Sequence, residues 1–241
     1  MREVITRFGR SNLGALWLFL EPMLFTAGVM TLWALVEGHR ESSIPIAAFA
    51  ITGYSSVLVW RNCATHCVMA INTNRALLYH RNVTVLDLVI TRCIIEIAGA
   101  TSSFIILSAF LIWFGLFSLP FDLLEVIGGW VFLAWLGAAL GTTLGAAAAY
   151  SELVERLWHP ISYFLFPLSG AAFMVDWLPE KFQKAVLALP MVHGVEIMRE
   201  GYFGDTVRTH YDLVFLVCWC LLLSLFGIYL ARKAALRVEM Q

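Results

Sequence analysis

The segment Val57–Cys67, VLVWRNCATHC, places an arginine, an asparagine, a histidine and two cysteines inside an otherwise apolar run. Thiols and imidazoles are ligands of soft and borderline metal ions. Two neighbouring cysteines could also form a redox pair, whereas guanidinium, amide and hydroxyl groups hydrogen-bond to polar ligands. The segment therefore suits a metal site, a redox pair or the wall of a hydrated passage.

Helical geometry separates the polar side chains of this segment from its cysteines. At about 100° per residue, the polar residues fall in one sector about 140° wide, and this sector includes Tyr54, Arg61, Asn62, Thr65 and His66. Cys63 and Cys67 lie outside it. The pattern favours a polar wall with packed cysteines behind it. A polar face buried against a neighbouring helix or a second protomer remains the alternative.

Two groups of residues have metal-ligand spacing but lack a complete ligand set. Cys63, His66 and Cys67 stand at i, i+3 and i+4, yet no fourth ligand is visible for the tetrahedral site that structural zinc prefers. His193 and Glu196, at i and i+3, lack a third ligand. We therefore predict no metal, and we expect a structural or gating role for His193 and Glu196.

Composition places these residues in a membrane protein. The chain has 241 residues, of which 60% are hydrophobic and 14% charged, and its net charge is −1. Soluble domains have about a quarter charged residues, so the apolar excess indicates several membrane spans. The near-neutral charge argues against a nucleic-acid binder. The five cysteines all lie in apolar runs and imply no disulfide framework. No cleavable signal peptide is expected.

The predicted fold is an all-α polytopic membrane protein with six transmembrane helices, each needing roughly 20 apolar residues. The spans are predicted at 13–36, 44–71, 86–117, 123–150, 158–174 and 213–231. The fifth contains Pro160 and Pro167, so we expect it to be kinked or broken. The excess of lysine and arginine in alternate loops predicts that both termini are cytoplasmic.

Four further segments have recognisable patterns. Residues 1–12 form an amphipathic pattern typical of a helix lying on the inner leaflet. Residues 72–85 and 151–157 are short polar segments on the predicted cytoplasmic side, and residues 179–203 fit two short re-entrant helices on the outer side. Gly137, Gly141 and Gly145 recur every four residues, which predicts close packing against another helix.

Motifs of catalytic machinery are missing from the sequence. There is no GxxxxGK[ST] phosphate loop, GxSxG elbow or HExxH zinc motif. Arg92 and Glu96 are one helical turn apart and can neutralise each other. Transport is therefore the favoured function, and we predict no catalytic residues.

Three segments resemble the permease subunits of ABC-2 type polysaccharide exporters, most closely those of the KpsM capsular type. They are REVITRFGRSNLGALWLFLEP, NTNRALLYHRNVTVLDLVITR and LPMVHGVEIMREGYF, and the likeness covers essentially the whole chain. The resemblance implies a homodimer with two separate ATPase subunits, which bind ATP and Mg; no cofactor is expected on this chain. It also implies a periplasmic adaptor, an outer-membrane export protein and a lipid-linked polysaccharide substrate, in the inner membrane of a Gram-negative bacterium.

The resemblance also suggests roles for the singled-out residues. Sugar hydroxyls pair with amides and hydroxyls, and acidic sugars with a cation, so the predicted substrate passage comprises Tyr54, Trp60, Arg61, Asn62, Thr65, His66, Tyr163 and Phe166. Coupling to the ATPase is assigned to Arg75, Tyr79, Arg81, Glu152 and Arg156. Gating or structural roles are assigned to Glu21, Pro22, His193, Glu196 and Arg199.

Two alternatives remain open. The substrate could be that of another ABC-2 exporter, such as O-antigen, teichoic acid or a drug. The chain could also be an intramembrane lipid-modifying enzyme, which would be active without an ATPase.

Overall fold

The computed structural model describes residues 14–37, 45–74 and 84–238, and these are helical apart from turns and short connections. The longer elements are α2 (Gly14–Glu37), α4 (Ser56–Thr73), α6 (Val85–Trp113), α7 (Leu123–Ala148), α8 (Glu152–Leu168) and α11 (Leu213–Val238). The shorter ones are α3 (Ile46–Ala50), α9 (Glu180–Val186) and α10 (Pro190–Phe203).

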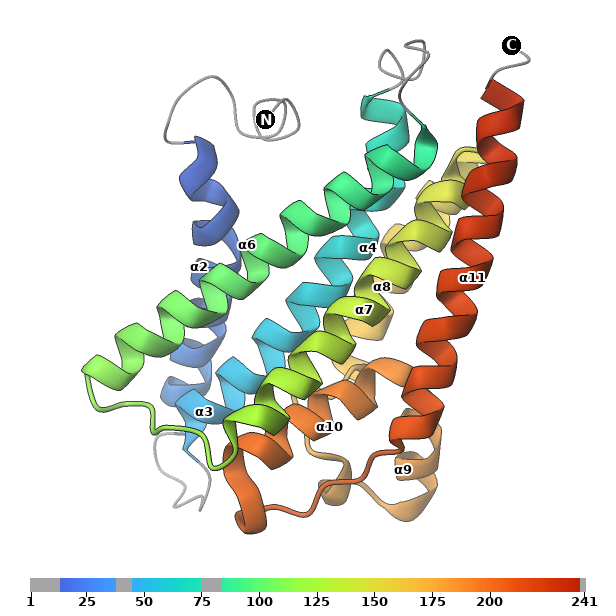
Figure 1. Ribbon diagram of the computed structural model, residues 1–241. Coiled ribbons are helices and arrows are strands. Elements are labelled where there is room, and N and C mark those ends of the chain that lie inside the picture. The colour runs from blue at the N-terminus through green and yellow to red at the C-terminus, as the bar shows by residue number, and fades with distance from the viewer. Residues whose placement is uncertain (1–13, 38–44, 75–83, 239–241) are drawn as a thin grey trace.

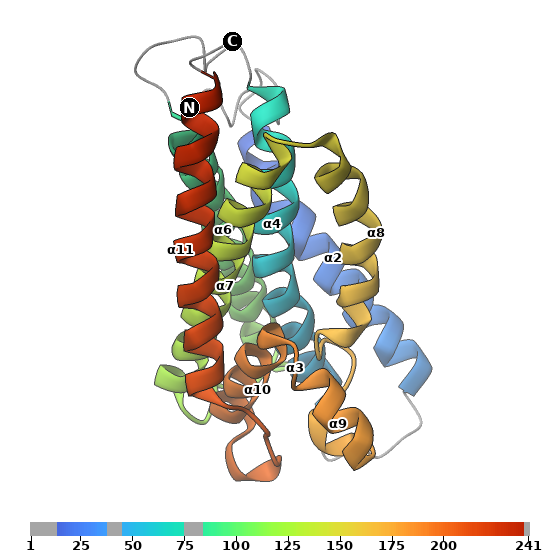
Figure 2. The same cartoon turned by 90° about the vertical axis from the view of Figure 1, so that its right-hand side faces the viewer.

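The long helices run between the same two ends of the molecule and alternate in direction along the chain (Figures 1 and 2). The start of α2, the α7–α8 connection and the end of α11 lie at one end, whereas α9 and α10 lie at the other. The predicted all-helical fold is therefore confirmed for the described ranges.

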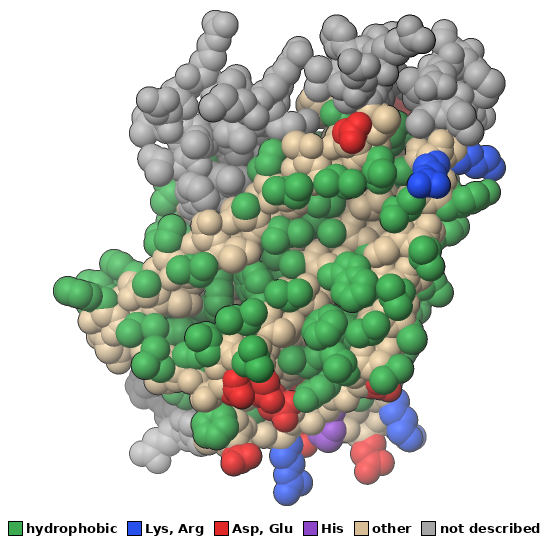
Figure 3. Space-filling view, viewed as in Figure 1, with side chains coloured by type: hydrophobic (Ala, Val, Ile, Leu, Met, Phe, Trp, Pro, Cys, Tyr) green, Lys and Arg blue, Asp and Glu red, His purple; other side chains and the backbone are tan. Residues whose placement is uncertain are grey.

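Three helices of the described ranges are long and apolar enough to cross a membrane: α6, α7 and the Leu213–Ala234 part of α11. An apolar belt covers the face seen in Figure 3, and charged side chains gather beyond it at the end that holds α10. Exposed apolar side chains in such a belt fit a hydrocarbon environment. The chain is thus a helical membrane protein.

The structure corrects the predicted limits of two segments. The second span is interrupted by a π-helical turn, Ile51–Ser55, between α3 and α4. Residues 151–157, predicted as a polar segment before the fifth span, belong to the same helix as that span: they form the cap and first turns of α8, and Ser151 caps it by accepting a hydrogen bond from Leu153 N. α8 then continues through Pro160 and ends at Leu168, before the predicted limit at Met174. Residues 1–12 and most of 72–85 lie outside the described residues.

The glycine repeat of α7 packs against α4, as predicted. A Cβ on Gly137 would lie 2.7 Å from the Cα of Trp60, and one on Gly145 would lie 2.9 Å from the carbonyl oxygen of Cys67. Such distances leave no room for a side chain, so the α4 and α7 backbones meet directly. The same helix packs on α10 at Gly129, where a Cβ would lie 2.7 Å from Met198 N.

Candidate functional site

Arg61 lies among aromatic rings contributed by three helices. Its guanidinium carbon is 4.9 Å from the ring centroid of Tyr163 and 5.6 Å from that of Phe166, both on α8. Phe166 in turn lies 5.9 Å from Tyr54 and 5.9 Å from Phe25 of α2. The Arg61 Nε is buried and has no hydrogen-bond partner. Aromatic faces attract a cation, so this arrangement holds a positive charge between α4 and α8, and no carboxylate within the described part of the chain forms an ion pair with it.

A hydrogen bond joins α8 to α4 one turn further along. Trp158, which is 5% exposed, donates its indole N–H to the Thr65 hydroxyl at 3.1 Å. Tyr163 is 68% exposed on the isolated chain, whereas Phe166 is half-buried. The predicted residues Tyr54, Arg61 and Thr65 therefore do face the aromatic part of the fifth predicted span.

His66 and Trp60 do not share this face. The Nδ1 of His66 lies 3.1 Å from the Glu96 carboxylate, which also pairs with Arg92 at 3.1 Å, so His66 faces α6. Trp60 is completely buried, with its Cα beside Gly137 of α7. Trp60, predicted from the sequence to line the passage, packs in the protein interior in this structure. Asn62 is half-buried on α4.

A π-helical turn, Ile51–Ser55, precedes α4, whereas the predicted sector assumes one uninterrupted α-helix from Tyr54 onward. Ser55, in this turn, lies beside α2, where its hydroxyl is 3.5 Å from that of Thr26. The turn does not account for His66, because His66 and Arg61 both lie on the regular α4 helix, about 140° apart around its axis. His66 faces α6 because the predicted sector is wide.

His193 of α10 fixes two backbone segments at the outer end. Its Nδ1 accepts from Asp212 N at 2.8 Å, so the other ring nitrogen, Nε2, is the one that donates to Leu187 O, also at 2.8 Å. Burial lowers the pKa of His193, which favours this neutral form. Both ring nitrogens are used, and neither is available to a metal.

Glu196 and Arg199 fix the chain that follows α8. Arg199 is fully buried; it donates to the carbonyl oxygens of Phe173 and Ala171 and lies 4.4 Å from the ring centroid of Phe49. Glu196 accepts hydrogen bonds from Val175 N and His210 N. Burial raises the pKa of Glu196 and lowers that of Arg199 to about 10, while each charge opposes the shift of the other. We name His193, Glu196 and Arg199 the α10 latch.

The remaining predicted residues are widely separated. Glu21 is exposed on the isolated chain, and Pro22 is a buried residue within α2. Glu152 and Arg156 pair with each other at 3.3 Å on the exposed start of α8. Arg75, Tyr79 and Arg81 lie outside the described residues.

Sequence reasoning missed Phe25, Trp158 and Cys93. Each lies on a helix other than α4. Each contacts α4, or the π-helical turn before it, only because the tertiary fold brings the helices together. No spacing rule along one helix could have joined them to the VLVWRNCATHC segment. The aromatic content of the fifth span was the one available signal.

The family comparison identifies the class of membrane protein. The model of the ABC-2 type transporter family matches residues 1–203. The chain belongs to this family of membrane proteins, and membership implies a partner ATPase subunit.

Relatives define the group within that family. The chain is 42% identical over all 241 residues to the capsule polysaccharide export inner-membrane protein CtrC of Neisseria meningitidis serogroup B, covering 91% of that protein. It is 40% identical over its whole length to BexB of Haemophilus influenzae, which carries the same description, again covering 91%. It is 24% identical over 219 residues, 89% of this chain and 85% of the relative, to the polysialic acid transport protein KpsM of Escherichia coli. The chain is a member of the capsule polysaccharide export inner-membrane proteins.

Proposed function

We propose that this chain is the membrane subunit of an ATP-driven transporter that exports a lipid-linked capsular polysaccharide across the inner membrane. The names of its full-length relatives support the substrate class. The alternating long helices, with both ends of the described chain at one side, support six spans and two cytoplasmic termini.

The observation that carries the mechanism is the setting of Arg61. A cation held between aromatic rings can meet an acidic sugar or a lipid phosphate, while the rings stack on the apolar faces of pyranose units. Neighbouring hydroxyl and amide groups can exchange hydrogen bonds with sugar hydroxyls. The proposed passage is lined by Tyr54, Arg61, Asn62, Thr65, Tyr163 and Phe166.

Opening this passage requires α8 to move relative to α4. In the described structure Thr65 is engaged by Trp158, and Tyr54 is covered by Phe25 and Phe166. A sugar chain passing here would replace these contacts with its own. The passage is thus closed in this conformation, and His66 would join it only if the contact between α4 and α6 also changed.

The energy source would lie on separate subunits. Two copies of the chain would assemble with two ATPase subunits, which bind ATP and Mg. The cytoplasmic contacts would be residues 72–85, with Arg75, Tyr79 and Arg81, and the start of α8, with Glu152 and Arg156. Residues 1–12 would lie along the inner leaflet. A periplasmic adaptor and an outer-membrane export protein would complete the route.

The α10 latch would close the outer end. α9 and α10 lie together at the end opposite the α7–α8 connection, which fits the predicted pair of re-entrant outer helices. Because His193, Glu196 and Arg199 tie α10 to backbone on both its sides, they would keep this closure rigid while α8 moves.

The test is export in cells that lack their own membrane subunit. The chain would be expressed with the ATPase, adaptor and outer-membrane genes from its own chromosomal neighbourhood. Wild-type chain should co-purify with the ATPase and restore surface polysaccharide. Arg61→Ala should insert and co-purify normally yet leave polysaccharide inside the cell, whereas Arg208→Ala, an exposed arginine at the outer end, should export normally. Normal export by Arg61→Ala would remove Arg61 from the passage, and failure to bind any ATPase would overturn the transporter assignment.

A further inference from the structure

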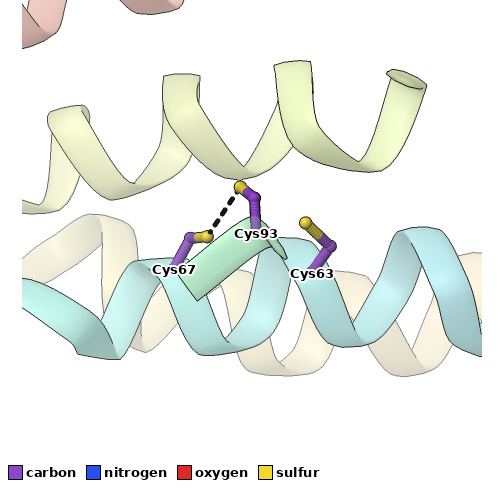
Figure 4. A group of neighbouring side chains, drawn as sticks. All are labelled: Cys63, Cys67 and Cys93. Atoms are coloured by element: carbon purple, nitrogen blue, oxygen red, sulfur yellow. Dashed lines mark hydrogen bonds between the residues drawn. The ribbon is translucent and has the colours of Figure 1, made fainter. Parts of the chain in front are cut away.

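Three of the five cysteines in the chain converge at one point between α4 and α6. Cys63 and Cys67 stand one turn apart on α4, and Cys93 of α6 faces them, as Figure 4 shows. The three sulfur atoms all lie within 4.8 Å of one another, and the Cys67 and Cys93 sulfurs are 3.4 Å apart. All three side chains are at most 4% exposed.

The surroundings of this cysteine cluster are apolar and closed. Val89, Ile97 and Ala138 pack around the thiols. The backbone of α7 comes close on another side, since a Cβ on Gly141 would lie 3.0 Å from the Cys67 sulfur. The contacts of the thiols with backbone carbonyls are long ones, from Cys67 to Val89 O and from Cys93 to Ala138 O, both at 3.8 Å, and the Thr142 side chain also interacts with Cys93.

We propose that Cys63, Cys67 and Cys93 bind one soft, thiophilic metal ion of the Cu(I) class. Metal–thiolate bonds of about 2.3 Å in a trigonal arrangement hold their sulfurs about 4 Å apart. The observed separations already approach that geometry, so small side-chain rotations complete it. Sulfur ligands alone select soft ions over the hard ions that prefer oxygen.

Binding exchanges protons for the metal ion. Each Cu–S bond replaces one S–H bond, because the thiolate is the metal ligand, and each displaced proton passes to water. No electron is transferred. The bound ion would join α4 to α6 beside the proposed passage.

The proposed site differs from the expectation, drawn from the sequence, that the chain binds no metal. On α4 alone, the third ligand beside Cys63 and Cys67 would have been His66. The structure turns His66 toward Glu96 instead and supplies Cys93 from α6. The ligand set is therefore entirely sulfur, and three sulfurs in a trigonal arrangement suit Cu(I) better than zinc, which prefers four tetrahedral ligands.

The test is a Cu(I) titration of the detergent-purified permease–ATPase complex, under anaerobic reducing conditions and against a chromophoric Cu(I) chelator. Wild-type chain should bind one ion per permease chain, and bound Cu(I) should raise its thermal unfolding midpoint. Cys93→Ser should lose both effects, although without copper it should melt close to the wild type. Cys218→Ser and Cys220→Ser, on α11, should keep them.

Three results would overturn the proposal. One is equal Cu(I) binding by wild type and by the variant with serine at all three positions. Another is unchanged binding by Cys93→Ser. The third is a Cys67–Cys93 disulfide that mass spectrometry finds in the reduced preparation, because it would leave too few thiols. If Cys93→Ser does not fold, Cys93→Ala and Cys63→Ala should give the same loss.

Discussion

The guanidinium of Arg61 lies 4.9 Å from the ring centroid of Tyr163, which joins the middle of α4 to the exposed face of α8. The same guanidinium carbon lies 5.6 Å from the ring centroid of Phe166. A cation–π contact of this kind contributes about 0.5–2 kcal/mol, depending on how far it is desolvated. A contact of this size holds α8 weakly enough for the acidic sugar chain or lipid phosphate that we propose as ligand to compete for the arginine.

Tyr163 should matter for export through its ring and not through its hydroxyl. Tyr163→Phe keeps an aromatic face for Arg61, whereas Tyr163→Leu keeps only apolar bulk. We expect the phenylalanine variant to export normally and the leucine variant to lose most surface polysaccharide at an equal membrane level. Equal export by the two variants would show that the ring is not used.

The Trp158–Thr65 hydrogen bond should stabilise the closed position of α8. Trp158→Phe and Thr65→Val each remove the bond with little change of shape, and a net hydrogen bond contributes about 0.5–1.5 kcal/mol. A double-mutant cycle on thermal unfolding should therefore give a coupling energy of that size between the two positions. Trp17→Phe, at an exposed tryptophan of α2, serves as control and should not couple to Thr65→Val. Strictly additive effects of Trp158→Phe and Thr65→Val would mean that the bond does not hold the helices together.

The glycine face of α7 gives a stability test with a matched control on the same helix. A methyl group on Gly137 would meet the backbone of Trp60 at 2.7 Å, whereas one on Gly128 would meet nothing within 4 Å. Gly137→Ala should therefore cost about 1–3 kcal/mol through overpacking. Gly128→Ala should leave the unfolding midpoint unchanged or slightly raised. A smaller loss at Gly137 than at Gly128 would contradict the direct contact of α4 and α7.

The long helices were predictable because their signals are local. Apolar length placed α2, α6 and α7 within a few residues and located the start of α11, which continues beyond the predicted end at residue 231, and the glycine repeat identified the packed face of α7. The π-helical turn at Ile51–Ser55 and the continuation of α8 through Pro160 were not predictable, since tertiary packing overrides the local preference at each. The site shows the same limit. Arg61 was predicted from its own helix and its partners Tyr163 and Phe166 from the aromatic content of the fifth span, whereas Cys93 was not predicted to join Cys63 and Cys67.

Arg199 should be the most costly member of the α10 latch to replace. Its removal leaves the Ala171 and Phe173 carbonyls unpaired and the Glu196 carboxyl buried without its cation. Breaking a buried pair from one side costs about 3–5 kcal/mol, so Arg199→Met should reduce accumulation and lower the unfolding midpoint sharply. Glu196→Gln keeps an acceptor for Val175 N and His210 N and should be milder. Arg199→Met together with Glu196→Gln should recover part of the loss. No recovery in the double variant would mean that the unpaired carbonyls, and not the buried charge, dominate.

His193 should make the outer end sensitive to acid. Burial lowers its folded-state pKa, while the nearby Asp212 opposes the shift. In the unfolded chain the pKa is about 6.5, so as pH falls below that value the unfolded state takes up a proton first. The stability contributed by neutral His193 is thus fully present above about pH 6.5 and is lost progressively below it, by up to about 1.4 kcal/mol per pH unit.

His193→Gln separates this titration from the hydrogen bonds. A glutamine amide can still donate to Leu187 O and accept from Asp212 N, but it does not titrate. The glutamine variant should therefore show a smaller fall in unfolding midpoint between pH 7.5 and pH 5.5 than the wild type. His193→Ala should cost about 1–3 kcal/mol at both pH values, because it leaves a buried donor and acceptor unpaired. If the wild type and His193→Gln lose stability in parallel, the acid sensitivity belongs to another group and His193 acts only as a fixed hydrogen-bonding link between α10 and the start of α11.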